Sequence, residues 1–535
     1  MNIENLISQY EQLKSKRTAF DSVYTDINKF FTPHRGTYII DETPGTMTDA
    51  RTIHPSCLDV VEKLASRIDT DLTNLALNKL NITVTDDKIG SIDSIRVFAD
   101  TVSNKMREVF VSSASGWQQQ NVMSTFDIVS LGTGCITVEE TDKYPFVRFK
   151  AKHISRLYVT ESYEGMIDGV YEYMKVSLRN LLQKFELNQL SEQLRDKATS
   201  NNINDDVEVL RVTIPSKDAE LMCGYSEPDL YTEFYIEIKS KHIIESSPLS
   251  YLPYTVARYD VKTGEQYGRS PCWIALPIAK QLSTLSVMKN KALQMNLLPP
   301  VLTTDDGVLP KTRIKPGVLI SGGIDEITGM DKIRPYRTAD NLQVAVAEEQ
   351  QHIARLMQIF YAQGLPDNKN VRMTEMEIQA RLSELKSLAP TISRFQSEYL
   401  NEIAKKVYHI LYRKGVFGEA PIELKDTRLK FNFMGSLTKI HKLSELEGLQ
   451  QTYQFAAIAA QFDNSVLMNF DHNKAVRYFA DIAGAPIPII RPKEEVDAEK
   501  QAMAQQQQQL QNAQIAQMAG GTTADLIKAR GGING

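Results

Sequence analysis

Two long amphipathic segments, separated by a stretch rich in glycine and proline, constrain the fold of this chain more than any other feature. In the first, apolar residues recur every three or four positions from Ile274 to Met295, and Leu298-Pro299-Pro300 ends the pattern. Such a stripe predicts a long helix with one apolar face. A second helical pattern covers about 341–361, and the residues between the two segments are typical of short β-strands and turns. A small β element between two helices is an unusual design for an isolated globule.

The N-terminal half divides into helical and β-rich regions. Helical patterns fill most of the chain up to residue 129, with breaks at Pro33 and Gly116. Between 143 and 259, β-branched and aromatic residues alternate with polar ones, which is typical of antiparallel strands. A short helix is expected within this region at about 176–188. The predicted fold class is therefore α+β and predominantly α.

The C-terminal part contains a further long helical pattern. Thr374 and Glu377 match a T-x-x-E capping box, in which side chains satisfy the first N–H groups of a helix. The apolar stripe continues on both sides of Pro390, which predicts one kinked helix over about 374–414. Residues 440–484 are again helical in pattern. After Pro492 the chain is rich in alanine and glutamine and cannot build a core of its own.

The charge balance limits how the protein can meet nucleic acid. The chain has 61 Lys and Arg against 66 Asp and Glu, a net charge of -5. Proteins that wrap DNA without sequence preference need a basic excess to neutralise phosphates, so any contact with DNA is expected to be local or weak. The four cysteines form no C-x-x-C pair, which favours a reduced site of synthesis. We find no secretion signal and no apolar run that could cross a membrane.

No catalytic, metal or cofactor site is predicted from the sequence. The chain has no phosphate-binding P-loop motif, no H-E-x-x-H motif and no closely spaced His/Cys cluster. Gly132-Thr133-Gly134 lacks the third glycine of a dinucleotide-binding loop and follows a helix instead of a strand. We interpret it as a tight turn. Asp305-Asp306-Gly307 is interpreted as a hairpin turn, and lone histidines such as His153 and His352 as structural side chains.

Six segments, in the same order over nearly the whole chain, resemble the portal (head-to-tail connector) proteins of short-tailed bacteriophages. The first three are LKSKRTAFDSVYTDINKFFTPHRG, RTIHPSCLDVVEKLASRIDTDL and DIVSLGTGCITVEE. The last three are RYDVKTGEQYGRSPCWIALPIAKQLSTL, MTEMEIQARLSELKSLAPTISRFQSEYLNEI and DHNKAVRYFADIAGAPIPIIRPKEEVDAEKQAMAQQQQQ. Their common order makes the resemblance specific.

The resemblance implies the portal architecture, which maps onto the helical and β-rich segments above. The expected parts are a wing (1–265), a first stem helix (266–298), a β-containing clip (299–340), a second stem helix (341–361), a tunnel loop (362–373), a kinked helix returning to the wing (374–435), a helical crown (436–490) and a barrel helix or flexible Gln-rich tail (491–535). Two helices with a β element between them suit a ring subunit.

The resemblance also implies a function and its partners. Twelve subunits would form a ring at one capsid vertex of the virion, assembled in the host cytoplasm, through which double-stranded viral DNA is packaged and ejected. The implied protein partners are the terminase large subunit (the packaging ATPase), tail adaptor or head-completion proteins, the major capsid protein and the scaffold, with no membrane. Two alternatives are a non-viral oligomeric scaffold protein and an unrecognised nucleic-acid-processing enzyme.

Three groups of basic residues are candidates for contacts in such an assembly, although each could be merely solvated. The tunnel loop contributes Lys369 and Arg372, which would face the DNA channel. Residues of the first stem helix could face the lumen or a neighbouring subunit: Lys280, Lys289 and Lys291. Residues of the clip could contact the motor or a tail adaptor: Lys311, Arg313 and Lys315.

Overall fold

The computed structural model describes residues 3–35, 53–74, 80–84, 93–200, 203–225, 228–297, 342–362 and 393–419, with shorter pieces that include 301–302, 334–335, 429–432 and 451–459. In this part the protein is mixed α/β and mostly helical, in agreement with the predicted class. The chain divides into two compact units, residues 1–437 and 438–535. All elements discussed below belong to the first unit.

In the described N-terminal part, the helices α1 (Ile3–Phe31), α2 (Pro55–Ile68), α5 (Asp93–Val111) and α6 (Trp117–Leu131) precede the two larger sheets. The chain leaves α1 just before Pro33, which begins a 3-10 turn. Gly116 separates α5 from α6 and has a φ of +73°, a left-handed conformation that glycine adopts without a Cβ penalty. Both predicted helix breaks are confirmed.

The middle of the chain forms two antiparallel sheets, as predicted. The three-stranded sheet has the order β3-β2-β9, with bounds Val147–Lys152, Thr133–Glu140 and Tyr254–Arg258. The five-stranded sheet has the order β4-β5-β6-β7-β8, with bounds Leu157–Glu161, Ile167–Ser177, Asp206–Pro215, Tyr231–Glu237 and His242–Leu249. Helix α6 packs against β2 and β3.

The described part of the β-rich region also holds short α-helices, of which only the first was predicted. They are α7 (Leu178–Lys184), α8 (Glu192–Thr199) and α9 (Ser216–Cys223). Ser191 begins α8 as its N-cap, accepting a hydrogen bond from the N–H of Leu194. α8 and α9 have 8 residues each, too few for a helical stripe to stand out in the sequence.

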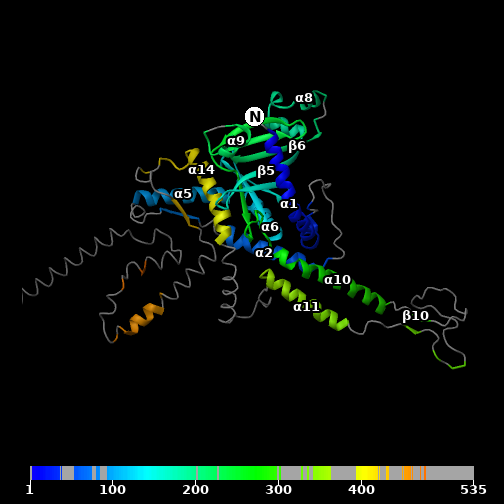
Figure 1. Cartoon of the computed structure of the whole chain (residues 1–535). Helices are drawn as coiled ribbons and strands as arrows, with labels where there is room; N and C mark the ends of the chain where they lie inside the picture. Colours follow the sequence, from blue (N-terminus) through cyan, green and yellow to red (C-terminus); the bar gives the residue numbers. More distant parts are fainter. Residues whose placement is uncertain are drawn as a thin grey trace, which may run out of the picture. The chain divides into compact units, whose positions relative to one another are not determined.

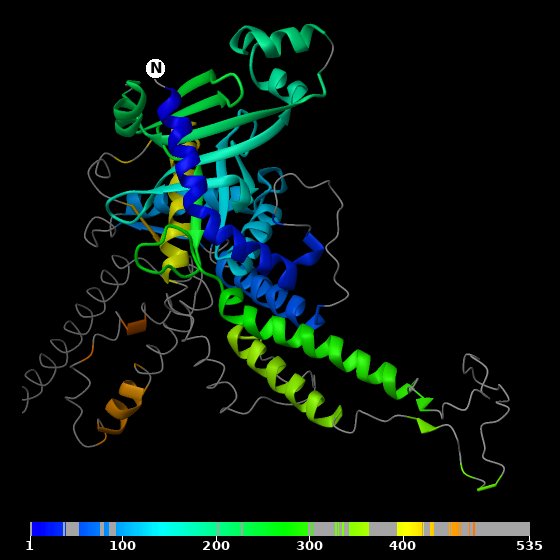
Figure 2. The same ribbon diagram turned by 45° about the vertical axis from the view of Figure 1, so that its right-hand side comes forward.

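The predicted pair of long helices is present as α10 (Pro271–Leu297) and α11 (Leu342–Ile359). They run side by side away from the sheets (Figure 1), and Figure 2 shows the same pairing from another side. Beyond α10, β10 (Val301–Leu302) pairs with β11 (Arg334–Pro335) in antiparallel register. The ends of the predicted β insert are therefore joined in a ladder between the two helices.

The last elements of the first unit return to the sheets. A π-helical turn, η7 (Gln396–Leu400), leads into α14 (Asn401–Arg413), and η7 packs on β9. β12 (Leu429–Asn432) pairs with β1 (Asn81–Val84). Several predictions lie outside the described residues: the interior of the β insert, the capping box, the kink at Pro390 and the tail after residue 476.

The main core contains an aromatic cluster that joins segments from both ends of the first unit. Trp117 of α6 packs edge-on against Phe149 of β3, with ring centroids 5.0 Å apart, and against Phe110 of α5 at 5.3 Å. Tyr399 of η7 is fully buried beside them and donates a hydrogen bond to Asn121 of α6. The core thus fixes η7 and α14 onto the N-terminal helices.

Candidate functional site: the helix pair and its anchor

Two of the three basic residues predicted on the first long helix form ion pairs within the chain. Lys280 of α10 lies 2.6 Å from a carboxylate oxygen of Asp26 in α1. Lys289 lies 2.6 Å from Glu349 in α11. Lys291 is exposed and has no ion pair among the described residues. Of the three, Lys291 therefore keeps an uncompensated charge, and whether any of them faces a lumen stays a prediction.

Glu349 links three helices at the base of the pair. It accepts hydrogen bonds from Lys289 of α10, and its carboxylate lies 3.1 Å from Nε2 of His54. His54 is the N-cap of α2, where its Nδ1 accepts a hydrogen bond from the N–H of Ser56. The Lys289 ammonium and the His54 contact hold the pKa of Glu349 below its ordinary value, against the opposing effect of burial.

Replacing Glu349 by glutamine is expected to loosen this junction by about 1–3 kcal/mol, because the partly buried Lys289 ammonium loses its charged partner. Since the pKa of Glu349 is depressed in the folded protein, its stabilisation is present above the unfolded pKa of about 4.3 and is lost as pH falls through the folded value. Amide hydrogen exchange of α11 would measure the loss. The neighbouring Glu348 is exposed, so Glu348→Gln is the control and should leave exchange unchanged. Equal exchange in both variants would contradict the role of Glu349.

The start of α10 is anchored by two short motifs that meet in space. The Gly132-Thr133-Gly134 turn follows α6, and Tyr267-Gly268-Arg269-Ser270 precedes α10. The N–H of Gly268 donates to the Thr133 hydroxyl at 2.8 Å, and the Ser270 hydroxyl donates to the carbonyl of Ser130 at 2.6 Å. The predicted tight turn is confirmed at Gly132 alone, since Thr133 and Gly134 already belong to β2. The contact between the two motifs holds the root of the helix pair.

Both motifs need glycine because their backbones touch. Gly132 ends α6 with a φ of +93°, and a Cβ built there would lie 2.5 Å from the carbonyl oxygen of Gly268. A Cβ on Gly268 would lie 2.1 Å from the carbonyl oxygen of Gly132. No side chain fits at either position without moving backbone, so the contact fixes the distance between α6 and α10.

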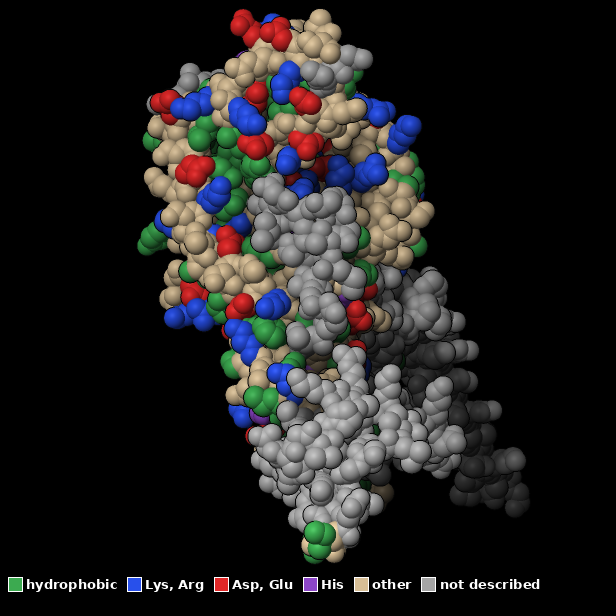
Figure 3. All heavy atoms as spheres, turned by 90° about the vertical axis from the view of Figure 1, so that its right-hand side faces the viewer, with side chains coloured by type: hydrophobic (Ala, Val, Ile, Leu, Met, Phe, Trp, Pro, Cys, Tyr) green, Lys and Arg blue, Asp and Glu red, His purple; other side chains and the backbone are tan. Residues whose placement is uncertain are grey.

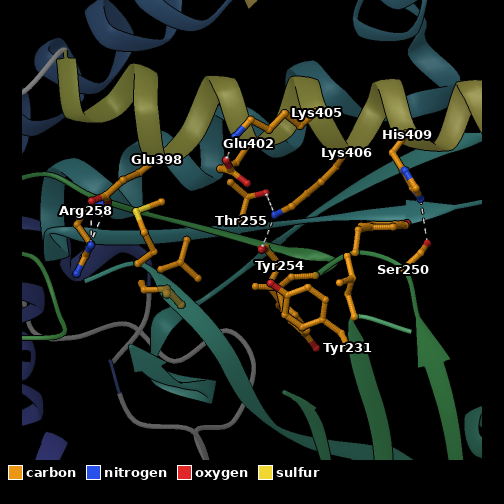
Figure 4. A pocket seen from close by; sticks show the side chains of 16 residues that line it. Tyr231, Ser250, Tyr254, Thr255, Arg258, Glu398, Glu402, Lys405, Lys406 and His409 are labelled. Carbon is orange, nitrogen blue, oxygen red and sulfur yellow. Dashed lines mark hydrogen bonds and ion pairs between the residues drawn. The ribbon is translucent and has the colours of Figure 1, made fainter. Parts of the chain in front are cut away.

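A pocket of about 310 Å³ lies between α14 and β9, and Figure 4 shows its charged lining. Arg258 forms a two-pronged pair with Glu398, and Lys406 donates to the carbonyl of Tyr254 and the hydroxyl of Thr255 at 2.7 and 2.8 Å. Burial lowers the pKa of Lys406 to about 8. Arg258 and Lys406 are both engaged by these partners. The charged residues of the pocket therefore have a structural role, which is to attach η7 and α14 to the β9 edge of the sheet.

Charged side chains of both signs share the surface. On the face shown in Figure 3, Lys and Arg side chains are interspersed with Asp and Glu over the described part. All four cysteines are buried and free. The described residues contain no group of three or more His, Cys, Asp or Glu side chains placed to hold a metal ion. None of the described helices is long and apolar enough to span a membrane.

The remaining predicted contacts lie outside the described residues: Lys311, Arg313, Lys315, Lys369 and Arg372. Sequence reasoning also missed Glu349 and Asp26, the acidic partners on the helix pair. Glu349 carried a usable signal, because it falls in register with the buried Leu356 of α11 and with Phe360, which directly follows the helix. An acidic residue on an apolar stripe indicates a paired charge.

Comparison with known proteins gives concordant matches over the length of the chain. The family described as bacteriophage head to tail connecting protein matches residues 4–490. The portal protein of Salmonella phage epsilon15 is 23% identical over 527 residues, which cover 96% of this chain and 94% of that protein. The probable portal protein of Bordetella phage BPP-1 is 19% identical over 534 residues, covering 97% and 94%.

Proposed function

The chain belongs to the bacteriophage head-to-tail connecting protein family, and from this premise we propose that it forms a ring at one capsid vertex through which double-stranded DNA is packaged and ejected. The observation that carries the proposal is the family match over residues 4–490, together with portal relatives aligned over nearly their full length. A scaffold unrelated to phage, or a nucleic-acid-processing enzyme, is not favoured by these matches. The proposed role is physical and not catalytic.

The helix pair supports a ring because its apolar side chains are not all covered within one chain. Large apolar residues are exposed along both helices: Ile274, Met288 and Leu297 on α10, and Val344 and Val346 on α11. Met288 and Leu297 lie on opposite faces of α10, as contacts with one neighbour on each side of a ring subunit require. We assign α10 and α11 as the two stem helices, packed against the same helices of neighbouring subunits.

The charges on the helix pair fit a channel that holds DNA without gripping it. Lys280 pairs with Asp26 and Lys289 with Glu349, so that Lys291 is the one of the three without an ion pair among the described residues. Every additional phosphate contact raises a salt-dependent affinity that would slow translocation. One uncompensated lysine in each subunit, repeated around a ring, gives a belt of weak contacts.

The other assignments follow from the family architecture. The residues before 266 would form the wing, 299–340 the clip, 362–373 the tunnel loop, 374–435 the kinked helix, 436–490 the crown and 491–535 a barrel helix or tail. Lys369 and Arg372 would meet DNA in the channel, and Lys311, Arg313 and Lys315 would meet the packaging ATPase or tail adaptors. The capsid protein and scaffold would contact the wing.

Reversing both tunnel-loop charges, Lys369→Glu with Arg372→Glu, is expected to leave ring assembly intact and to change the amount of DNA packaged per particle. Two acidic residues in each subunit would repel phosphates in the proposed channel. Genome length in purified particles, measured by gel electrophoresis, checks the prediction. The control is Lys16→Glu with Lys217→Glu, the same charge change at two exposed lysines of α1 and α9. A genome load equal to wild type in the tunnel-loop variant would remove these residues from the channel.

A further inference from the structure

The three-stranded sheet has a hollow beside each of its two edges. Ile136 of the central strand β2 pairs with Ala151 of β3 on one side and with Thr255 of β9 on the other. Thr255 lines the pocket of about 310 Å³ described above, and Ala151 lines a second pocket of about 590 Å³. The two pockets therefore open at opposite edges of one sheet.

Side chains cover backbone groups on both edge strands beside the two pockets, which hinders the addition of a further strand there. The Gln120 side chain accepts a hydrogen bond from the N–H of Ala151 at 2.7 Å, which covers β3. On the other edge, Glu398 accepts from the N–H of Arg258 and Lys406 donates to the carbonyl of Tyr254 (Figure 4). Since these backbone groups are already satisfied, a partner at either edge has to bind through side chains.

The β9 edge presents an acidic and apolar surface. Tyr163, in the turn between β4 and β5, is fully exposed, and Met166 and Leu230 are exposed at the rim of the smaller pocket. Glu164 and Asp229 are exposed beside them and have no ion pair in the described part of the chain. We call these five residues the β9-side surface. It combines a protruding aromatic ring with uncompensated negative charge.

The β3 edge presents the opposite charge. Arg35, Lys150 and Arg156 line the larger pocket. Lys150 pairs with Glu139 at 2.8 Å, whereas Arg35 and Arg156 have no ion pair within the described ranges. Met123 is exposed on α6, one turn beyond Gln120. We call Arg35, Met123, Lys150 and Arg156 the β3-side surface.

We infer that the β9-side surface of one copy docks on the β3-side surface of the next copy, with Tyr163 and Glu164 entering the basic pocket beside Arg156. The inference rests on the proposed ring and adds a second contact to it, apart from the helix pair. A ring is built from a head-to-tail interface, in which two different patches of the same chain must be complementary. These two surfaces meet that requirement in charge and in shape, with a protruding ring on one and a hollow on the other.

The chemistry of the contact follows from the side chains involved. An exposed tyrosine supplies a large rigid contact area, and tyrosine and arginine are the residues most often found at binding hot spots. An arginine guanidinium can stack on an aromatic ring while pairing with a neighbouring carboxylate. Arg35 already stacks on a ring, with its guanidinium carbon 3.3 Å from the ring centroid of Phe126. A tyrosine ring entering the pocket would extend that stack.

Two single charge reversals and their combination test this contact on the full-length protein. Glu164→Lys and Arg156→Glu should each raise the protein concentration at which half the subunits are in rings by about tenfold or more, because each places like charges in every contact of the ring. The chain that carries both changes restores opposite charges. Its assembly midpoint should return to within about threefold of wild type. Analytical ultracentrifugation gives the midpoints.

The controls separate this contact from folding and from the ring itself. Leu221→Ala with Lys217→Glu changes an equally exposed pair on α9 and should not shift the midpoint. Unchanged melting temperatures are expected for all variants, since the substituted side chains are exposed. The proposed contact is wrong, but the ring is not, if the two single variants have the wild-type assembly midpoint. The same conclusion follows if the midpoint of the combined variant is shifted by the sum of the two single effects. If wild-type protein forms no rings, the proposed function fails as well.

Discussion

Replacing Arg258 by alanine is expected to lower the free energy of unfolding by about 2–4 kcal/mol, because it removes the buried guanidinium that pairs with two partly buried carboxylates and leaves their hydrogen bonds unmade. Arg258 ends β9 and is 4% exposed. Its guanidinium donates to both carboxylate oxygens of Glu398, at 2.9 and 3.2 Å, and to Glu161 at 3.3 Å. It also donates to the carbonyl of Gly165 at 3.1 Å. One side chain therefore joins the turn between β4 and β5, the edge of the three-stranded sheet and η7.

Arg413→Ala is the matched control. Arg413 lies on α14 and pairs with Glu140, but its side chain is 52% exposed. An exposed pair contributes about 0–1 kcal/mol, so this substitution should shift the urea midpoint little. Circular dichroism in urea, on unassembled protein, compares the two variants. Arg258→Lys should also be strongly destabilising, because an ammonium cannot reproduce the two-pronged pair. A midpoint for Arg258→Ala equal to that of Arg413→Ala would show that the Arg258 cluster is not needed for stability.

Gly132→Ala is expected to prevent the accumulation of folded protein. The substitution imposes two costs at one position: a positive φ of +93° for a residue with a side chain, and a methyl group 2.5 Å from the carbonyl oxygen of Gly268. The first costs about 1 kcal/mol and the second about 1–3 kcal/mol or more, since backbone and not a flexible side chain must move. The soluble fraction after expression and the urea midpoint measure the combined loss.

Gly224→Ala isolates the first of these costs. Gly224 ends α9 with a φ of +68°, and a Cβ built there would have no atom within 4 Å. We therefore expect a loss of about 1 kcal/mol and soluble protein. The difference between the two alanine variants measures the close approach of the two motifs. If both variants lose the same stability, the contact between Gly132 and Gly268 does not restrict the fold.

Helical and strand periodicity predicted the elements of this protein well where the stripes were long. The apolar steps from Ile274 onward correspond to α10, and the alternation after residue 143 corresponds to antiparallel strands. The helix break at Gly116 was predictable because glycine readily adopts the left-handed backbone conformation found there, which few other residues adopt. The short helices α8 and α9 escaped prediction, since two turns contain too few apolar positions to reveal a period.

Partners distant in sequence could not be predicted, and Arg17 shows why. It falls in step with Leu6, Tyr10 and Leu13 on α1, so periodicity predicts that it points inward, and it is 2% exposed. Its guanidinium donates to the carbonyls of Ile154 and Ser155, at 2.6 and 2.7 Å. Nothing in the helix sequence identifies acceptors that only the folded β-rich region supplies.

The same reason explains the candidate site. Lys280 and Lys289 were recognised as cations on the long helix, but their partners Asp26 and Glu349 belong to other helices. In the proposed channel, their pairing would decide how much charge the helix offers to DNA. The Gly132-Thr133-Gly134 turn was recognised as a turn, whereas its contact with Gly268 required the tertiary structure.

The central claim, a ring with an axial channel, is tested most directly by negative-stain electron microscopy of the purified full-length protein. We expect top views with rotational symmetry and a central hole wide enough for duplex DNA. A uniform population of monomers or small closed dimers, persisting at high protein concentration, would contradict the ring and with it the proposed route for DNA.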